Sequence, residues 1–542
     1  MSISRLVMYQ STKLVKIVIL CSLALGSTLY TSTQTQAQSL AANVKKEEAS
    51  STSSSTRLTG GPILNREDAI ARAKLLLPLI PEGAEVDNVT KGIANYKSWN
   101  IGFVTPETDD NGRRLHSVNI ELRESDGKLM EFQASKWSGI TDTKEWDFST
   151  PSKIDIETAA TIAKNFAENQ PWKLDAQWVI NPARESEYST RTNDKSQYKF
   201  RFNRLVNGIR TGPYGFNEFS IFVDRTSGEV TSYQVNWHAL DFADPKGIIS
   251  KETAQSIILD NSLPFLFRLD EEKEFPLLYS INDRVLDAKT GKFPKNYNNE
   301  PVSTIPTGFK PKLKQEQAKR LLLSMYDVEL QYFPTGNNKA ELFYHLIVKP
   351  SVPLFYTGSA PFLDSNTGKW LNLAGDTVAD PVPANNGWVY DLVASPKRIK
   401  YAAAVVLDGQ LIPLKAEPII EKNEVLIPFR ELLKAMQANV TWNSGKKLVT
   451  ATTVTKKVQL TIGSKTAYIN GKSAKLTVPA RMINKSTVVP ARFLAEALGA
   501  TVTWNAESKL LLINTKKQEP PTKDELKQLR LKAQLNWEAL LK

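Results

Sequence analysis

One segment of the sequence occurs twice near its C-terminal end. VLIPFRELLKAMQANVTWN begins at Val425, and VVPARFLAEALGATVTWN begins at Val488. At an offset of 62 residues, nine of the sixteen positions from Pro428 to Asn443 are identical to their counterparts. Proline is tolerated in the first turn of a helix, apolar residues follow at helical spacing, and Gly499 ends the second helix. The duplication therefore predicts two matching strand–helix–strand half-domains.

Further strands are predicted around the duplicated segment, at KVQLTIG and KLLLIN, with YINGKS as a hairpin between the copies. Over residues 402–515 this organisation resembles the copper amine oxidase N-terminal-like domain, and LTIGSKTAYINGK, Leu460 to Lys472, carries the resemblance most specifically. In that family, oxidase chemistry belongs to a separate catalytic domain with a cofactor tyrosine and copper-binding histidines. Because the sequence has no histidine after His345, the resemblance implies no copper site in this region.

Four residues of the duplicated segment are candidate surface-binding residues: Arg430, Trp442, Arg492 and Trp504. Arginine binds anions and tryptophan stacks on sugar rings, so each pair would suit a wall glycan. Alternatively, each tryptophan fills the core under its helix and each arginine braces the end of a strand. The repetition of both residues in a duplicated fold favours the structural role. No catalytic, metal-binding or cofactor-binding residue is predicted.

The longer N-terminal part repeats a helix start, at NREDA, DIETA, SKETA and KQEQA. Alternating segments such as 118–122 and 233–237 predict half-buried antiparallel strands. DRTSGE, DAKTGK and DSNTGK place Asp and Gly as a hairpin turn requires, and they lack the distal Glu of a calcium loop. The chain is therefore predicted to be α+β and multidomain, with repeated helix plus antiparallel β-hairpin units followed by the duplicated strand–helix–strand domain.

Two stretches of this N-terminal part resemble a known repeat. NGIRTGPYGFNEFSIFVDRTSGEVTSYQVNW, from Asn207 to Trp237, resembles the YcdB/YcdC-type repeats of exported bacterial proteins, a family similar to PepSY domains. GSAPFLDSNTGKWLNLAG, from Gly358 to Gly375, resembles the end of such a repeat. PepSY-like domains are associated with restraining or chaperoning secreted peptidases and wall hydrolases. The resemblance therefore implies a regulatory partner of that kind.

Residues 1–37 have the pattern of a Sec-type signal peptide. Basic residues precede an apolar run, and TQA ending at Ala37 offers a cleavage site. The run is roughly a dozen residues long, whereas a spanning helix needs about 20, so a membrane would be contacted only through an uncleaved signal segment. Cys21 is the only cysteine, and its removal with the leader excludes disulfides and thiolate chemistry from the mature chain.

The mature chain is basic. The leader carries three of the 69 basic residues and none of the 57 acidic residues, which leaves a net charge of 66 − 57 = +9. Outside the cell this charge favours anionic partners such as wall polymers, and nucleic acid is not expected for an exported protein. The alternative is that the charge only keeps the protein soluble. We expect a secreted protein or one associated with the cell wall or cell surface.

These signals divide the chain into parts. The signal peptide is followed by a Ser/Thr-rich linker over 38–60. A first pair of YcdB/YcdC-type repeats, further PepSY-like repeats, a second linker, the copper amine oxidase N-terminal-like domain and an amphipathic helix are expected at 61–245, 246–380, 381–400, 401–515 and 516–542. The last helix has a capping box from Thr522 to Glu525 and an apolar stripe, which predicts docking on the rest of the chain.

No catalytic motif is found, and the three histidines, His116, His238 and His345, fall in or beside predicted strands of different repeats. We therefore expect a non-catalytic binding protein without a cofactor, with an anionic cell-wall polymer as its partner. An alternative is a PepSY-like regulator or inhibitor of a secreted peptidase or cell-wall hydrolase. A third hypothesis, a carboxylate-dependent hydrolase of wall polymers, stays open because the spacing of the acidic residues neither identifies nor excludes a catalytic pair.

Overall fold

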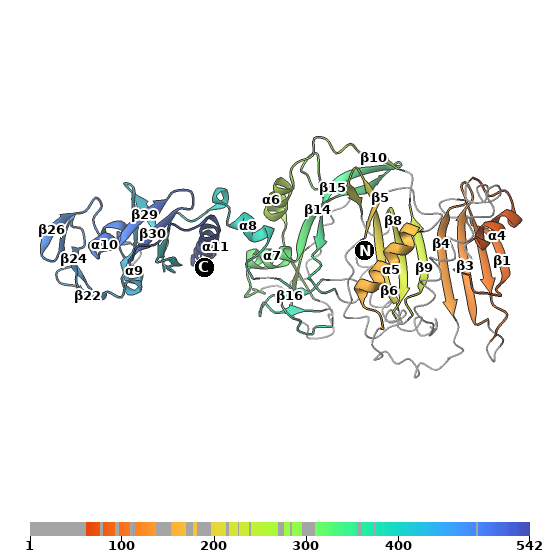
Figure 1. Cartoon of the computed structure of the whole chain (residues 1–542). Helices are drawn as coiled ribbons and strands as arrows, with labels where there is room; N and C mark the ends of the chain where they lie inside the picture. The colour runs from red at the N-terminus through yellow and green to blue at the C-terminus, as the bar shows by residue number, and fades with distance from the viewer. Residues whose placement is uncertain are drawn as a thin grey trace. The chain divides into compact units, whose positions relative to one another are not determined.

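The computed structural model describes residues 61–541 except 76–79, 93–96, 109–111, 113, 137–152, 170–176, 181–196, 213–215, 226, 238–239, 269–275, 282–284, 295–308, 355–359, 373, 383 and 484–485. The predicted signal peptide and the linker over 38–60 lie outside the described residues. The chain forms two compact units, Met1–Pro381 and Val382–Lys542 (Figure 1). In the part of the chain that is described, no helix is long and apolar enough to cross a membrane.

The first unit is α+β, with helices packed on a large, mainly antiparallel sheet. Its helices are α4 (Arg66–Lys74), α5 (Ile156–Asn169), α6 (Lys251–Asn261) and α7 (Gln315–Ser324). Its strands are β1 (Glu85–Gly92), β2 (Ser98–Val104), β3 (His116–Arg123), β4 (Leu129–Lys136), β5 (Gln177–Ile180), β6 (Gln197–Val206), β7 (Ile209–Thr211), β8 (Glu218–Asp224), β9 (Val230–Asn236), β10 (Asp241–Phe242), β11 (Phe265–Phe267), β12 (Leu278–Ser280), β13 (Val285–Asp287), β14 (Tyr326–Gly336), β15 (Lys339–Val348), β16 (Phe362–Asp364) and β17 (Trp370–Leu371).

The four helices begin where their local sequence predicts. The side chains of Asn65 and Ser250 accept hydrogen bonds from backbone N–H groups in the first turns of α4 and α6. Asp155 accepts one from the Thr158 N–H at 2.7 Å before α5. Hydrogen bonds from Thr158 hold the pKa of Asp155 below its usual range. At α7 the Lys314 N–H instead donates to the Gln317 side chain, at 3.3 Å.

The Asp–Gly signatures form hairpin turns, as predicted. Asp224 Oδ1 accepts the Ser227 N–H at 2.7 Å, and Asp287 Oδ1 accepts the Thr290 N–H at the same distance. Gly228 follows with φ of +77°, a left-handed conformation that glycine adopts without a steric cost. Among the described residues, no group of three or more His, Cys, Asp or Glu side chains is arranged to hold a metal ion.

The first two repeats form one continuous body. Their strands follow the order β1-β2-β3-β4-β9-β8-β6, and β4 pairs antiparallel with β9, which places Phe132 directly opposite Tyr233. In Figure 1, α5 lies along β6, β8 and β9, which it contacts, and α4 contacts β1 to β3. A single apolar core contains buried residues of both helices and both sets of strands, including the stacked rings of Phe202 and Phe219, 4.5 Å apart.

The third and fourth repeats are interleaved and do not form separate helix-and-hairpin units. Strand β12 of the third repeat pairs with β16 of the fourth, in a four-stranded sheet of order β11-β12-β16-β17. Strand β13 instead pairs with β15 in the 13-stranded sheet. The helix starts and turn signatures are present as predicted, but the strands that follow them are distributed over two sheets.

The second unit contains the duplicated segment and is also α+β. Its helices are α8 (Trp388–Val393), a 3₁₀ helix η6 (Pro396–Arg398), α9 (Phe429–Ala435), α10 (Ala491–Ala497) and α11 (Lys523–Leu540). Its strands are β18 (Ala404–Leu407), β19 (Gln410–Leu411), β20 (Ile419–Glu421), β21 (Glu424–Pro428), β22 (Asn439–Asn443), β23 (Leu448–Thr452), β24 (Lys457–Thr461), β25 (Thr466–Ile469), β26 (Lys472–Lys475), β27 (Arg481–Ile483), β28 (Ser486–Pro490), β29 (Thr501–Asn505) and β30 (Leu510–Asn514).

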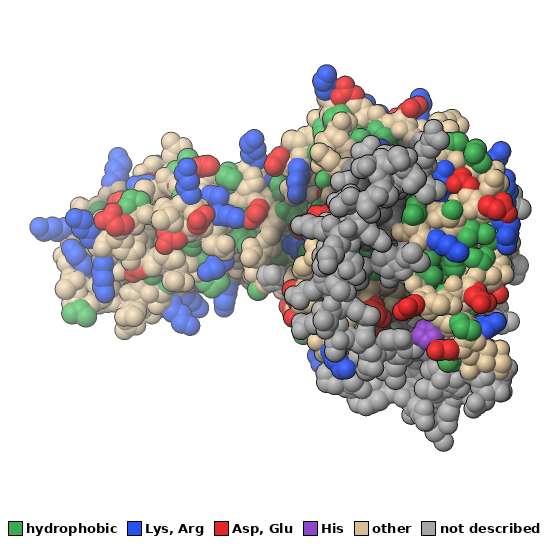
Figure 2. Space-filling model, turned by 45° about the vertical axis from the view of Figure 1, so that its right-hand side comes forward, with side chains coloured by type: hydrophobic (Ala, Val, Ile, Leu, Met, Phe, Trp, Pro, Cys, Tyr) green, Lys and Arg blue, Asp and Glu red, His purple; other side chains and the backbone are tan. Residues whose placement is uncertain are grey.

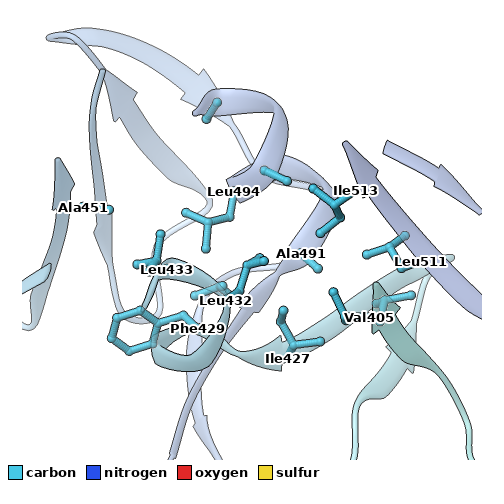
Figure 3. Packing of buried hydrophobic residues seen from close by; sticks show 14 of the residues in the cluster. Val405, Ile427, Phe429, Leu432, Leu433, Ala451, Ala491, Leu494, Leu511 and Ile513 are labelled. Atoms are coloured by element: carbon cyan, nitrogen blue, oxygen red, sulfur yellow. The ribbon is translucent and has the colours of Figure 1, made fainter. Parts of the chain in front are cut away.

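The two half-domains meet at β21 and β28, which pair antiparallel with Ile427 opposite Val489. Beyond this shared sheet, β22 to β26 form a five-stranded antiparallel sheet in chain order, and β19-β18-β30-β29 form a four-stranded sheet. Figure 3 shows that side chains from both halves fill one core, with Leu432 and Leu433 of α9 beside Leu494 of α10. The predicted strand–helix–strand duplication is therefore present, and its halves share their apolar interior.

Residues 381–400, predicted as a linker, instead contain α8 and η6. Tyr390 and Ala394 are buried against Leu531 of α11, so this stretch belongs to the second unit. Tyr390 and Val393 of WVYDLV pack against α11, a contact between distant segments that the local sequence does not show.

The C-terminal helix α11 docks on its own unit, as its apolar stripe predicts. The Thr522 side chain accepts the Glu525 N–H and the Glu525 side chain accepts the Thr522 N–H, which completes the predicted capping box. Leu529 and Ala533 pack on the outer face of β18 and β30. Arg530 donates to the Ala394 carbonyl at 2.6 Å and to Ser508 Oγ at 2.9 Å.

Candidate functional site

The duplication extends further than the sequence comparison suggested. At the offset of 62, the turn Asp408–Gly409 of the first copy corresponds to Asn470–Gly471 of the second, and all four residues have positive φ between 47° and 83°. The signal was present in the sequence, because VLDGQ and YINGK both place Asp or Asn before Gly. Each half therefore consists of a hairpin, a strand pair, a short helix and a further strand pair.

Each helix of the duplication is followed by a residue with positive φ, but the type of residue differs between the two copies. Gln437 follows α9 with φ of +57°, and its counterpart Gly499 follows α10 with φ of +98°. A left-handed conformation is costly for a residue with a Cβ and natural for glycine.

Substitution of Gln437 by glycine is expected to raise the free energy of unfolding by about 0.5–1 kcal/mol, because strain at this turn is relieved. The reciprocal change, Gly499→Gln, is expected to lower it by about 1 kcal/mol through backbone strain alone, since no atom lies within 4 Å of an added Cβ. Urea denaturation measures both. A destabilised Gln437→Gly protein would contradict the assignment of strain.

Arg492 and Trp504, the candidate residues of the second half, have structural contacts. Arg492 Nη1 donates a long hydrogen bond, 3.4 Å, to the carbonyl of Val502 on β29, and it lies 3.8 Å from Glu496. Trp504 on β29 is partly buried and packs against the shared core. For this half the arginine contacts a neighbouring strand and the tryptophan packs against the core, in line with the structural alternative.

Arg430 and Trp442, the candidate residues of the first half, are placed differently. Trp442 on β22 is 47% exposed, and the Arg430 side chain on α9 is exposed and makes no hydrogen bond or ion pair with a described residue. The expectation that both tryptophans fill the core is therefore wrong for Trp442. One sequence difference accompanies this: Glu431 of α9 stands where α10 has Phe493, which packs against the core.

The strongest electrostatic feature of the second unit is a stretch without acidic residues. From residue 432 to residue 495 the sequence has no Asp or Glu, and it has eleven Lys and Arg residues. Seven of these are lysines of the five-stranded sheet and its turns: Lys446, Lys447, Lys456, Lys457, Lys465, Lys472 and Lys475. In Figure 2 blue side chains gather at the left end of this unit, where Figure 1 places β22, β24 and β26.

None of these seven lysines forms an ion pair with a described residue, although other cations of the same unit do. Arg481 pairs with Glu421, and Lys527 pairs with Asp391. Unpaired like charges repel one another and focus a positive potential on the surface that carries them. The net charge of the mature chain does not reveal this concentration, although the absence of acidic residues can be read directly from the sequence.

The histidines are separated and do not form a site in the described part of the chain. His116 lies at the start of β3, and His345 lies in the middle of β15, where its ring packs against Phe333 at 5.2 Å. His238 lies outside the described residues.

The comparisons with known proteins find two domain families in the chain. Residues 89–237 match the model of the YcdB, YcdC repeated domain, and residues 406–513 match that of the copper amine oxidase N-terminal domain. The resemblance of Asn207–Trp237 and that of the duplicated domain are confirmed, whereas Gly358–Gly375 lies outside the matched residues and its resemblance stays a prediction. The second model describes a non-catalytic N-terminal domain and not the oxidase itself.

Among solved structures, the Bacillus megaterium YpeB C-terminal domain is similar, with 16% identity and a TM-score of 0.29, over 43% of this chain and 97% of that chain. A search of the curated proteins gives no match.

Proposed function

We propose that the protein is an exported, non-catalytic binding protein that is held on an anionic cell-wall polymer by its C-terminal unit. The observation that carries the proposal is the five-stranded sheet β22–β26, whose seven lysines have no acidic neighbour in sequence from residue 432 to residue 495. A surface of this kind attracts polyanions over a distance and holds them by many weak contacts. The partial exposure of Trp442 adds an aromatic surface on β22.

Retention on purified cell walls is expected to depend strongly on salt. Between about 0.1 M and about 1 M salt the Debye length falls from about 10 Å to about 3 Å, so contacts between exposed charges are screened. We expect residues 38–542 to be retained at low salt and the bound fraction to fall about tenfold or more at high salt, measured by sedimentation with the walls. No retention at low salt would contradict the proposal, and so would retention that high salt leaves unchanged.

Two variants that remove the same amount of charge distinguish binding by this surface from attraction by the net charge of the chain. Lys446→Gln with Lys447→Gln removes two lysines from the turn between β22 and β23. Lys516→Gln with Lys517→Gln removes two exposed lysines outside the acid-free stretch. We expect only the first pair to reduce retention, whereas equal losses would mean that the overall charge binds the walls.

A second candidate function, regulation of a secreted peptidase or wall hydrolase, is favoured by one feature of the first unit. Strand β1 lies at the end of the 13-stranded sheet, and β2 is its one partner among the described strands. Such an edge can accept a strand from another protein. Incubation with culture supernatant tests this function. Recovery of one peptidase or hydrolase at unit stoichiometry, with the walls left empty, would support it over wall binding.

A further inference from the structure

In the second unit the sheet β19-β18-β30-β29 and the sheet β22–β26 each contain strands of both copies, and their outer faces differ. Val406 on β18 and Leu512 on β30 lie against α11 and are 2% and 8% exposed. At the offset of 62 residues, their counterparts are Tyr468 on β25 and Thr450 on β23, both in the five-stranded sheet. Tyr468 is 45% exposed. Corresponding positions of the two copies are thus apolar and covered in one sheet, and polar and open in the other.

The open face carries a continuous row of hydroxyl and amide side chains across all five strands. We call it the central row: Thr441, Thr450, Gln459, Tyr468 and Ser473. Each member lies directly opposite the next in the antiparallel register, so their side chains point to the same face. Neighbouring strands are about 4.8 Å apart, which gives the row a length of about 19 Å. Gln459 also donates to Thr450 Oγ1 at 3.5 Å.

The lysines flank the central row at both of its sides. Lys446, Lys447, Lys465 and Lys475 lie at one end of the strands, and Lys456, Lys457 and Lys472 lie at the other. Lys457 and Lys475 lie on the same face as the row, because each is an even number of positions from a row member on its own strand. A linear polymer that followed the row would therefore run between two lines of positive charge.

The chemistry of this face selects one kind of polymer. Its cations are all lysines, which bind phosphate as point charges, whereas paired recognition of planar carboxylates favours arginine. Threonine, glutamine and serine offer donors and acceptors for hydroxyl groups, and the ring of Tyr468 offers a flat apolar surface for the carbon face of a sugar or polyol.

We propose that the open face of the five-stranded sheet binds a polymer of polyol or sugar units joined by phosphodiesters, along the central row and between the lysines. This inference rests on the proposed function and specifies the site and the polymer. The absence of Asp and Glu from 432 to 495 follows from it, because a carboxylate beside the row would repel each phosphate.

The test uses residues 38–542 and poly(glycerol phosphate) as the probe, with titration calorimetry at several salt concentrations. Lys457→Gln with Lys475→Gln is expected to weaken binding about tenfold, and to lower the slope of log affinity against log salt by about two. The control, Lys516→Gln with Lys517→Gln, is expected to change the affinity by less than about twofold.

Tyr468 supplies a neutral variant of the same site. Tyr468→Ala is expected to weaken binding about fivefold with an unchanged salt slope, and Tyr468→Phe, which keeps the ring, is expected to restore most of the affinity. Because Tyr468 is 45% exposed, we expect both variants to fold as the unchanged protein does. A thermal melt of each variant checks this, so that a loss of binding can be assigned to the site.

Several results would overturn the inference. Equal losses in the two lysine pairs would mean diffuse attraction by the net charge. Equal or tighter binding of polygalacturonate would assign the face to carboxylates, and tighter binding of a single-stranded oligonucleotide would assign it to nucleic acid. None of these outcomes would contradict retention of the protein on cell walls, which the sedimentation experiment measures separately. Conversely, failure of the protein to sediment with walls, together with site-specific binding of poly(glycerol phosphate), would overturn the proposed function and leave the site intact.

Discussion

Replacement of Phe132 by alanine is expected to lower the free energy of unfolding of the first unit by about 3–5 kcal/mol. Phe132 on β4 is 1% exposed, and it lies opposite Tyr233 of β9 where the first two repeats join. The loss combines the transfer energy of the ring with the cost of the remaining cavity. Because a single core contains residues of both repeats, we expect both to be destabilised together.

Hydrogen exchange measured by mass spectrometry checks this expectation at the level of each repeat. Peptides from α4 of the first repeat and from α5 of the second should lose protection by similar factors. The matched control is Leu64→Ala, since Leu64 is 80% exposed and its truncation should change the stability by less than about 0.5 kcal/mol. Loss of protection confined to the first repeat would show that the repeats unfold as separate bodies.

The second large effect is expected in the shared core of the duplicated domain. Leu494 of α10 and its counterpart Leu432 of α9 are both fully buried in the same cluster (Figure 3). Leu494→Ala and Leu432→Ala should each lower the free energy of unfolding of the second unit by about 2–5 kcal/mol. Because the cluster draws on both halves, either substitution should destabilise the strands of both.

Denaturant titration measures the loss, and hydrogen exchange in β22 and β29 shows whether the two halves open together. Leu541→Ala is the control, since Leu541 is 62% exposed and belongs to the same unit. If Leu432→Ala left the protection of β29 unchanged, the halves would be independent domains, and the single core would not couple them.

Features that depend on neighbouring residues could be predicted from the sequence. The helix starts at Asn65 and Ser250, the hairpin turns at Asp224 and Asp287, and the capping box at Thr522 are local hydrogen-bond patterns, and all are present. The duplication was equally readable, because identical residues at a constant offset require the same local structure twice.

Features that depend on distant contacts could not be predicted. Nothing local to β12 shows that its partner is β16, some eighty residues later in the chain. Trp442 and Trp504 stand in the same motif at the same spacing, yet only Trp504 packs against the core, because burial is decided by the surrounding side chains. Likewise, the open face of β22–β26 can be recognised only by comparison with the corresponding face of β18 and β30, which α11 covers.

The pairing of β18 with β30 has a consequence for how the second unit assembles. The two strands are parallel neighbours, with Val405 opposite Leu511, although β18 begins the first copy and β30 ends the second. Contacts between such distant segments are slow to form, because the intervening chain must first be closed into a loop. During synthesis or export from the N-terminus, β18 is present long before β30, so the edge of β18 that pairs with β30 stays unpaired until nearly the whole unit is available. An unpaired strand edge can pair with other chains, so we expect a chaperone to protect it until the unit folds.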